Sequence, residues 1–224
     1  MIIICILYST HKQDSRGSEE LSKCITAMLD ESNDPGSRLH GVYYILGATA
    51  VDSNKMNEFT KIAEKRYEGH ELKFKDYSEY RHEILNEISE LKVRLYAVTV
   101  RKPLFRKWNS EEQRNVHRTA LFRLMNKIAE EETAANIHMI IDENNKAKSG
   151  TIEYLTVTVA NKRKKNITSE IKRSNGSFAL QTNDFSLGAM NKKYNHGDSQ
   201  YADRFPHISR SRIIIRKVRS IRKK

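Results

Sequence analysis

An apolar stretch that runs directly into carboxylates is the feature of this chain that most restricts its fold. Residues 24–29 are apolar or β-favouring, and Asp30, Glu31 and Asp34 follow before Pro35-Gly36 turns the chain. This pattern predicts a buried strand with acids at its end. Carboxylates in such a position are costly unless they are paired or bind a cation. A polar turn after a strand is the plainer interpretation of the same residues.

The same arrangement occurs a second time, because the mostly apolar residues 137–141 end in Asp142 and Glu143. If the two strands are neighbours in one sheet, Asp30 and Asp142 come close together, and like charges at that separation disfavour double ionisation. A divalent cation would relieve the repulsion, and hard oxygen ligands suit Mg²⁺ or Mn²⁺. Two such ions about 3.5–4 Å apart can support phosphodiester cleavage.

Three further acids could complete this cluster. Asp184 lies in a predicted helix over residues 178–190 and shares a helix face with Gln181, three residues earlier. Glu71 and Glu31 are the other candidates. Each has a plainer interpretation, since Asp184 also fits an exposed helix position and Glu71 a surface strand.

The rest of the chain alternates predicted strands with predicted helices, which is typical of an α/β fold. Residues 42–51 are expected to form a strand that pairs with the first as an antiparallel hairpin. Capping-box patterns at Asp76/Glu79 and Ser110/Gln113 predict the starts of two helices. Glu132, near the end of the second of these helices, is expected to be exposed. The remaining predicted elements are a helix at 54–67, strands at 93–100 and 152–159, and, from residue 209, a strand, a helix or disorder.

The charge of the chain predicts a polyanionic partner. The net charge is +12 over 224 residues, and nine Lys or Arg residues but no acid follow Asp203. We therefore expect an N-terminal extension over residues 1–22, one domain over 23–203, and a basic tail over 204–224.

Several other classes of protein are disfavoured. No apolar run approaches the roughly 20 residues of a membrane helix, and the N-terminal residues lack the pattern of a signal peptide. Cys5 and Cys24 fit neither a disulfide scaffold nor a zinc site, so a cytoplasmic location is expected. The histidines lack a metal-binding spacing, and nucleotide-binding and serine-hydrolase motifs are absent from the sequence.

Five short motifs, in order, resemble the domain of unknown function 3800 family, which is regarded as having a ribonuclease H-like fold. They are Asp-Glu-Ser-Asn-Asp from residue 30, Glu-Leu-Lys from 71, the strand that ends at Lys102, Ile-Ile-Asp ending at 142, and Leu-Gln-Thr-Asn-Asp-Phe from 180. Asn33 and Asn183 stand where Gly and Ala are usual in that family. The resemblance covers roughly residues 23–201.

This resemblance implies a ribonuclease H-like mixed central sheet flanked by helices, with a set of acids that act in catalysis. The implied acids are Asp30, Glu71, Asp142 and Asp184, with Glu31, Asp34, Lys73 and Gln181 around them. Lys73 is expected to contact phosphate. The basic residues expected to hold the nucleic-acid backbone are Lys102, Arg210, Arg212, Arg216, Lys217 and Arg219.

These observations predict a nuclease that depends on Mg²⁺ or Mn²⁺ and acts on DNA or RNA, and they leave its oligomeric state open. One alternative is a non-catalytic nucleic-acid-binding or accessory protein that retains the fold. In a further alternative, the basic tail docks on an acidic protein or a membrane surface.

Overall fold

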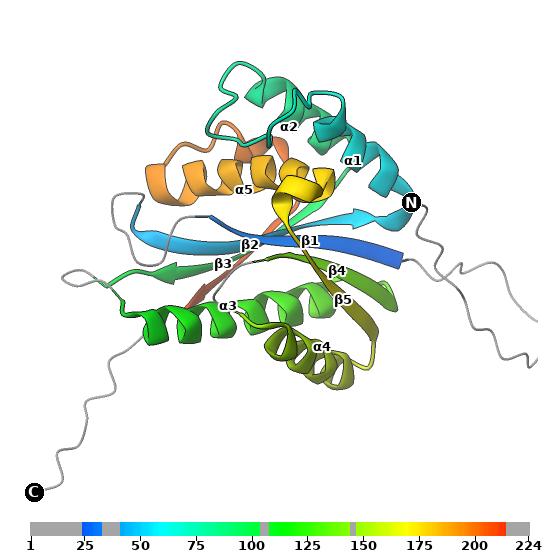
Figure 1. Ribbon diagram of the computed structural model, residues 1–224, viewed down its shortest axis with the longest axis vertical. Helices are drawn as coiled ribbons and strands as arrows, with labels where there is room; N and C mark the ends of the chain where they lie inside the picture. Colours follow the sequence, from blue (N-terminus) through cyan, green and yellow to red (C-terminus); the bar gives the residue numbers. More distant parts are fainter. Residues whose placement is uncertain (1–23, 33–40, 104–107, 144–146, 214–224) are drawn as a thin grey trace, which may run out of the picture.

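The computed structural model describes residues 24–32, 41–103, 108–143 and 147–213. In these residues a central sheet lies between two helical layers (Figure 1). Helices α1, α2 and α5 cover one face, and α3 and α4 cover the other. The strands are β1 (Cys24–Ser32), β2 (Tyr43–Asp52), β3 (Arg94–Arg101), β4 (Asn136–Asp142), β5 (Asn166–Lys172) and β6 (Ile208–Ile213). The helices are α1 (Met56–Glu64), α2 (Arg81–Glu90), α3 (Ser110–Glu131), α4 (Ser149–Arg163) and α5 (Phe178–His196), with single 3-10 turns at Ser53–Lys55, Ser174–Gly176 and Ala202–Arg204.

The sheet is mixed, with the strand order β5-β4-β1-β2-β3-β6. β1, β2 and β3 form an antiparallel meander, while β4 runs parallel to β1, β5 parallel to β4, and β6 parallel to β3. This topology confirms the expected α/β class with a mixed central sheet flanked by helices. It also confirms the hairpin expected between the first two strands.

Side-chain alternation along β1 divides the core into two parts. Ala27 and Leu29 pack into the cluster under α3 and α4, whereas Met28 packs into the cluster under α1, α2 and α5. In β4, Met139 and Ile141 pack into the cluster under α3 and α4, and Ile140 packs into the cluster under α1, α2 and α5. By the same alternation, Asp30 and Asp142 belong to the face that α5 covers.

The prediction of a strand over residues 152–159 is wrong, because this segment lies in α4. Its buried side chains are Ile152, Leu155, Thr156 and Val159, which follow helical spacing. The exposed face of α4 carries Tyr154 and Val157, so apolar residues occur on both sides and imitate the composition of a strand.

Both expected capping boxes differ from the observed helix starts. α3 begins one residue early, with a box in which Asn109 accepts from the Glu112 amide and Glu112 accepts from the Asn109 amide. α2 follows Tyr80 without a side-chain cap, so the Asp76/Glu79 box does not form.

Glu132 is buried rather than exposed, which corrects the expectation from its place in an acidic run. Its carboxylate accepts from Arg94 Nε at 2.6 Å and from the Tyr96 hydroxyl at 2.8 Å. The three residues connect the end of α3 to β3, and a charge-assisted partner makes the burial tolerable.

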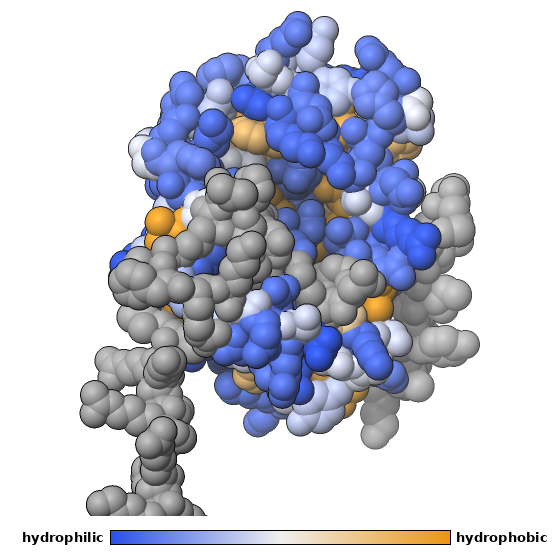
Figure 2. All heavy atoms as spheres, turned by 60° about the vertical axis from the view of Figure 1, so that its left-hand side comes forward, coloured by the Kyte–Doolittle hydropathy of each residue, from blue (hydrophilic) through white to orange (hydrophobic). Residues whose placement is uncertain are grey.

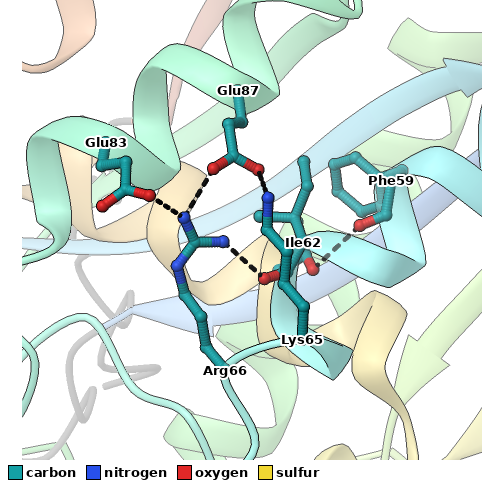
Figure 3. Close-up of polar contacts among 7 residues, drawn as sticks. Phe59, Ile62, Lys65, Arg66, Glu83 and Glu87 are labelled. Carbon is teal, nitrogen blue, oxygen red and sulfur yellow. Dashed lines mark hydrogen bonds and ion pairs between the residues drawn. The ribbon is translucent and has the colours of Figure 1, made fainter.

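An ion-pair cluster joins the end of α1 to α2 in the helical layer that also contains α5 (Figure 3). Arg66 donates to Glu83 and Glu87, and also to the carbonyl oxygen of Ile62, so its positive charge is fully matched by carboxylates. In the view of Figure 2, the described surface is mainly hydrophilic with scattered apolar residues. Among the helices of the described ranges, none is both long enough and apolar enough to cross a membrane.

Candidate functional site

The site is built on Asp30 and Asp142, which lie on adjacent parallel strands. The register pairs Leu29 with Ile141, so the next residue of each strand is one of the two aspartates. The carboxyl ends of parallel strands meet at one edge of a sheet, and both side chains lie on the α5 face. The two carboxyl groups are close enough for each to affect the pKa of the other. The repeated strand-then-acid pattern of the sequence therefore corresponds to one pair of acids in space.

Burial and mutual repulsion make Asp30 hard to ionise. Its pKa lies well above the ordinary value, first because the carboxyl is buried and then because Asp142, Asp184 and Glu31 are nearby. The backbone amide of Glu31 donates to Asp30 Oδ1 at 2.6 Å and acts in the opposite direction. An acid of this kind gains from any cation that can replace the proton.

Asp142 shares this environment. Burial raises its pKa, and the charges of Glu71 and Glu31 act in the same direction, whereas hydrogen bonds from the Ser174 amide and with Asp30 lower it. The Ser174 amide lies in the turn that connects β5 to α5 and donates to Asp142 Oδ1 at 3.0 Å.

Asp184 reaches the pair from α5. Burial raises its pKa, while the Phe74 amide, which donates to Asp184 Oδ2 at 2.7 Å, and the charge of Lys73 lower it. α5 approaches this loop closely because Gly188 has no side chain, and a Cβ there would lie 2.1 Å from Cγ of Phe74. The loop between α1 and α2 is thus fixed against the helix that carries the third aspartate.

Gln181, which is 1% exposed, holds the two segments that surround the acids. Its Oε1 accepts from the Leu72 amide at 3.0 Å, and its Nε2 donates to the Ser174 carbonyl at 3.1 Å. The Leu72 segment includes the neighbours Glu71 and Lys73, and Ser174 is the residue whose amide binds Asp142. One buried amide therefore connects the two segments directly.

Glu71 and Lys73 form an ion pair at 3.0 Å in the loop that precedes α2. Glu71 is close enough to Asp142 and Asp184 to influence both, and Lys73 acts on Asp184. The candidate acids from four separate parts of the chain are therefore gathered in one region.

Glu31 is the exception, because its side chain turns to the other face of the sheet. The Tyr44 hydroxyl donates to Glu31 Oε2 at 2.8 Å and lies 2.6 Å from Nδ1 of His117, a buried residue of α3. The same nitrogen is 3.4 Å from Glu31 Oε2. Glu31 affects Asp30 and Asp142 through its charge while Tyr44 and His117 hold its carboxylate.

The expected nucleic-acid contacts are spread over different environments. Lys102, which follows β3, is only 2% exposed. Arg210 and Arg212 lie on β6, so they belong to the sheet. Asp34, Arg216, Lys217 and Arg219 are outside the described residues.

Sequence reasoning missed the groups that hold the acids. The amides of Ser174 and Phe74 have no sequence signal, because every residue except proline supplies an N–H. His117 had a signal, since it lies three residues before Ala120 in the buried stripe of α3.

The donor set suits a hard cation bound through few protein ligands. Across the ranges that the structure describes, no group of three or more His, Cys, Asp or Glu side chains has the spacing to hold a metal ion. The Asp30/Asp142 pair nevertheless provides carboxylate oxygens in a half-buried position where negative charge is disfavoured. Mg²⁺ is usually bound in this way, by one or two carboxylates completed by water and substrate phosphate.

Neither a family model nor a curated protein matches this chain. Among solved structures, the chain is similar to RNase HII from Archaeoglobus fulgidus, which was determined as a complex with PCNA. The alignment covers 76% of this chain and 73% of that chain, with 8% identity and a TM-score of 0.44. The resemblance to the domain of unknown function 3800 family rests on the five sequence motifs.

Proposed function

We propose that this protein is a divalent-metal-dependent nuclease that hydrolyses phosphodiester bonds of DNA or RNA, and that it is related to the domain of unknown function 3800 family. The observation that supports this most directly is the half-buried Asp30/Asp142 pair on adjacent parallel strands, with Asp184 facing it from α5. Buried acids that resist ionisation cluster at sites with a chemical task.

Asp30 and Asp142 would hold Mg²⁺ or Mn²⁺, with Asp184 and Glu71 beside them. Such an ion, when bound, activates water and offsets the charge that develops on a phosphodiester. The protein supplies fixed carboxylates, oriented by the Ser174 and Phe74 amides and by the bridge through Gln181. The Lys73 ammonium would leave its ion pair with Glu71 and bind a substrate phosphate instead, because this ion pair is partly exposed.

The test is Asp142→Asn, assayed for cleavage of labelled DNA and RNA with Mg²⁺ or Mn²⁺. We expect the loss of cleavage with nearly unchanged binding of nucleic acid, because the change removes a carboxylate but not the basic surface. Glu143→Gln is the matched control, since Glu143 is the next carboxylate and pairs with Arg173 at the surface. Full activity of the Asp142→Asn protein would show that this site is wrong.

A second candidate is a non-catalytic nucleic-acid-binding protein with the same fold. It is supported by the net charge of +12, which favours a polyanionic partner without requiring catalysis. Calorimetry separates the two candidates. A nuclease should bind Mn²⁺ in a way that the double change Asp30→Asn with Asp142→Asn abolishes, and a non-catalytic protein should show no such binding.

A further inference from the structure

Arg210 and Arg212 project from the same face of the edge strand β6. In the parallel register, Arg210 lies opposite Ala97 and Arg212 opposite Thr99 of β3. Residues two apart share a face of a strand, and this is the face that α5 covers. Arg210 Nε donates to the Thr99 hydroxyl at 3.0 Å, and Arg212 Nη2 donates to the Tyr43 hydroxyl at 3.0 Å.

Both guanidinium groups also lie over tyrosine rings. The Arg210 Cζ is 4.1 Å from the ring centre of Tyr194 in α5 and 5.3 Å from that of Tyr43. The Arg212 Cζ is 5.5 Å from the Tyr43 ring centre. Ring faces attract a cation without neutralising its charge, so these contacts orient the two arginines and leave the charge in place.

The partners of these two arginines differ from those of other arginines. Arg66, Arg94 and Arg173 each form an ion pair with at least one carboxylate (Figure 3 shows Arg66). Within the described part of the chain, neither Arg210 nor Arg212 has a carboxylate within ion-pair distance, and Arg210 Nη2 is buried without a hydrogen-bond partner. Two ordered positive charges with neutral partners are a site for an anion.

The position of this surface fits a long phosphodiester. The sheet register connects Asp30 through Gly47 and Ala97 to Arg210, which is three strand spacings or about 14 Å. Along α5, Asp184 and Tyr194 are ten residues apart, which is about 15 Å. The two estimates agree, so a strand that passes the acids could continue along this face to the two arginines.

We propose that Arg210 and Arg212, ordered by Tyr43, Tyr194 and Thr99, bind backbone phosphates of the nucleic acid about 14 Å from the acids. The proposal rests on the proposed function for the class of partner, but its site is separate from Asp30, Asp142 and Asp184. A guanidinium fork suits phosphate oxygens better than an ammonium does. Binding of this type does not depend on base sequence.

The test measures binding of the full chain to a labelled 20-nucleotide single-stranded DNA by fluorescence anisotropy in EDTA, over a range of NaCl concentrations. For Arg210→Gln with Arg212→Gln, loss of two phosphate contacts should reduce the slope of log K against log salt by about 1.4. If the affinity extrapolated to 1 M salt is unchanged, this is a loss of about 25-fold at 0.1 M salt. Lys61→Gln with Arg118→Gln, which changes two exposed cations on α1 and α3, is the charge-matched control and should leave the slope unchanged.

An unchanged slope in the Arg210/Arg212 protein would overturn the proposal, and so would binding of phosphatidylserine vesicles in place of the oligonucleotide. If the double variant does not fold, the exposed Arg212 is changed alone to Gln and should reduce the slope by about 0.7.

The outcome of this binding test is independent of catalysis. Loss of cleavage in Asp142→Asn with normal binding by the Arg210/Arg212 protein would refute this surface and retain the nuclease. A reduced slope in the Arg210/Arg212 protein together with full cleavage by the Asp142→Asn protein would retain the surface and refute the nuclease.

Discussion

Replacement of Asp30 by Asn should stabilise the metal-free protein at neutral and alkaline pH. Asp30 is half-buried beside Asp142, and its pKa is raised well above the ordinary value by loss of solvation and then by the neighbouring acids. Side chains opposite each other on adjacent strands are about 5 Å apart. Two unit charges at that distance repel each other by about 3 kcal/mol at an effective dielectric constant of about 20. Asn removes this repulsion and can still accept the Glu31 amide.

The pH dependence has a defined sign. Because the folded pKa of Asp30 exceeds the unfolded value of about 3.9, the folded state holds more protons, and stability falls as the pH rises from there through the folded pKa. The stabilisation by Asn should therefore be absent below about pH 4 and should reach its full size above the folded pKa. For a domain of this size, about 3 kcal/mol corresponds to an increase in Tm of about 6–12 °C.

Thermal unfolding followed by circular dichroism in EDTA, at acidic and at alkaline pH, measures this effect. Glu153→Gln is the control, because it removes one exposed carboxylate of α4 and should leave Tm almost unchanged. Added Mg²⁺ at 100 times its Kd should raise the stability of the wild type by about 2.7 kcal/mol and have little effect on the variant. A lower Tm of Asp30→Asn at alkaline pH in EDTA would refute the electrostatic reasoning.

Two further changes test the supports of the site and the start of α3. Gln181→Leu leaves the Leu72 amide without its partner and removes one of the two donors to the Ser174 carbonyl, so it should destabilise the protein by about 1–3 kcal/mol and weaken Mn²⁺ binding. Unchanged Mn²⁺ affinity in calorimetry would show that the bridge is only structural. Asn109→Ala should cost about 1 kcal/mol in urea unfolding and Ser110→Ala only a few tenths, and the opposite ranking would contradict the observed cap.

The sequence predicts the strands best where composition and burial agree. Residues 24–29 and 137–141 are mostly apolar because both faces of these central strands are covered, and the acids that follow them stand out from this apolar composition. β5 has no such signal, since Thr168, Glu170 and Lys172 of this edge strand share one polar face. Val and Thr in α4 favour β-structure intrinsically, but packing of Ile152, Leu155 and Val159 decides for a helix.

The candidate site is less predictable than the strands, for a physical reason. The types and order of the acids are in the sequence, but what holds them is not. The Phe74 and Ser174 amides depend on loop paths, and the bridge through Gln181 depends on two loops meeting at one side chain. The stacking of Tyr43 and Tyr194 on Arg210 joins β2, α5 and β6, which no local pattern of the sequence relates.

The place of β1 between β2 and β4 has a consequence for synthesis of the chain. The antiparallel meander of β1, β2 and β3 can pair early, but the other edge of β1 waits for β4, which follows it by more than a hundred residues. At about 5–20 residues per second, translation leaves that apolar edge unpaired for about 5–20 s. During this interval the nascent chain exposes a strand edge of the kind that pairs with other chains. The need for chaperones that protect this strand edge should therefore end when residue 142 has emerged and β4 pairs with β1.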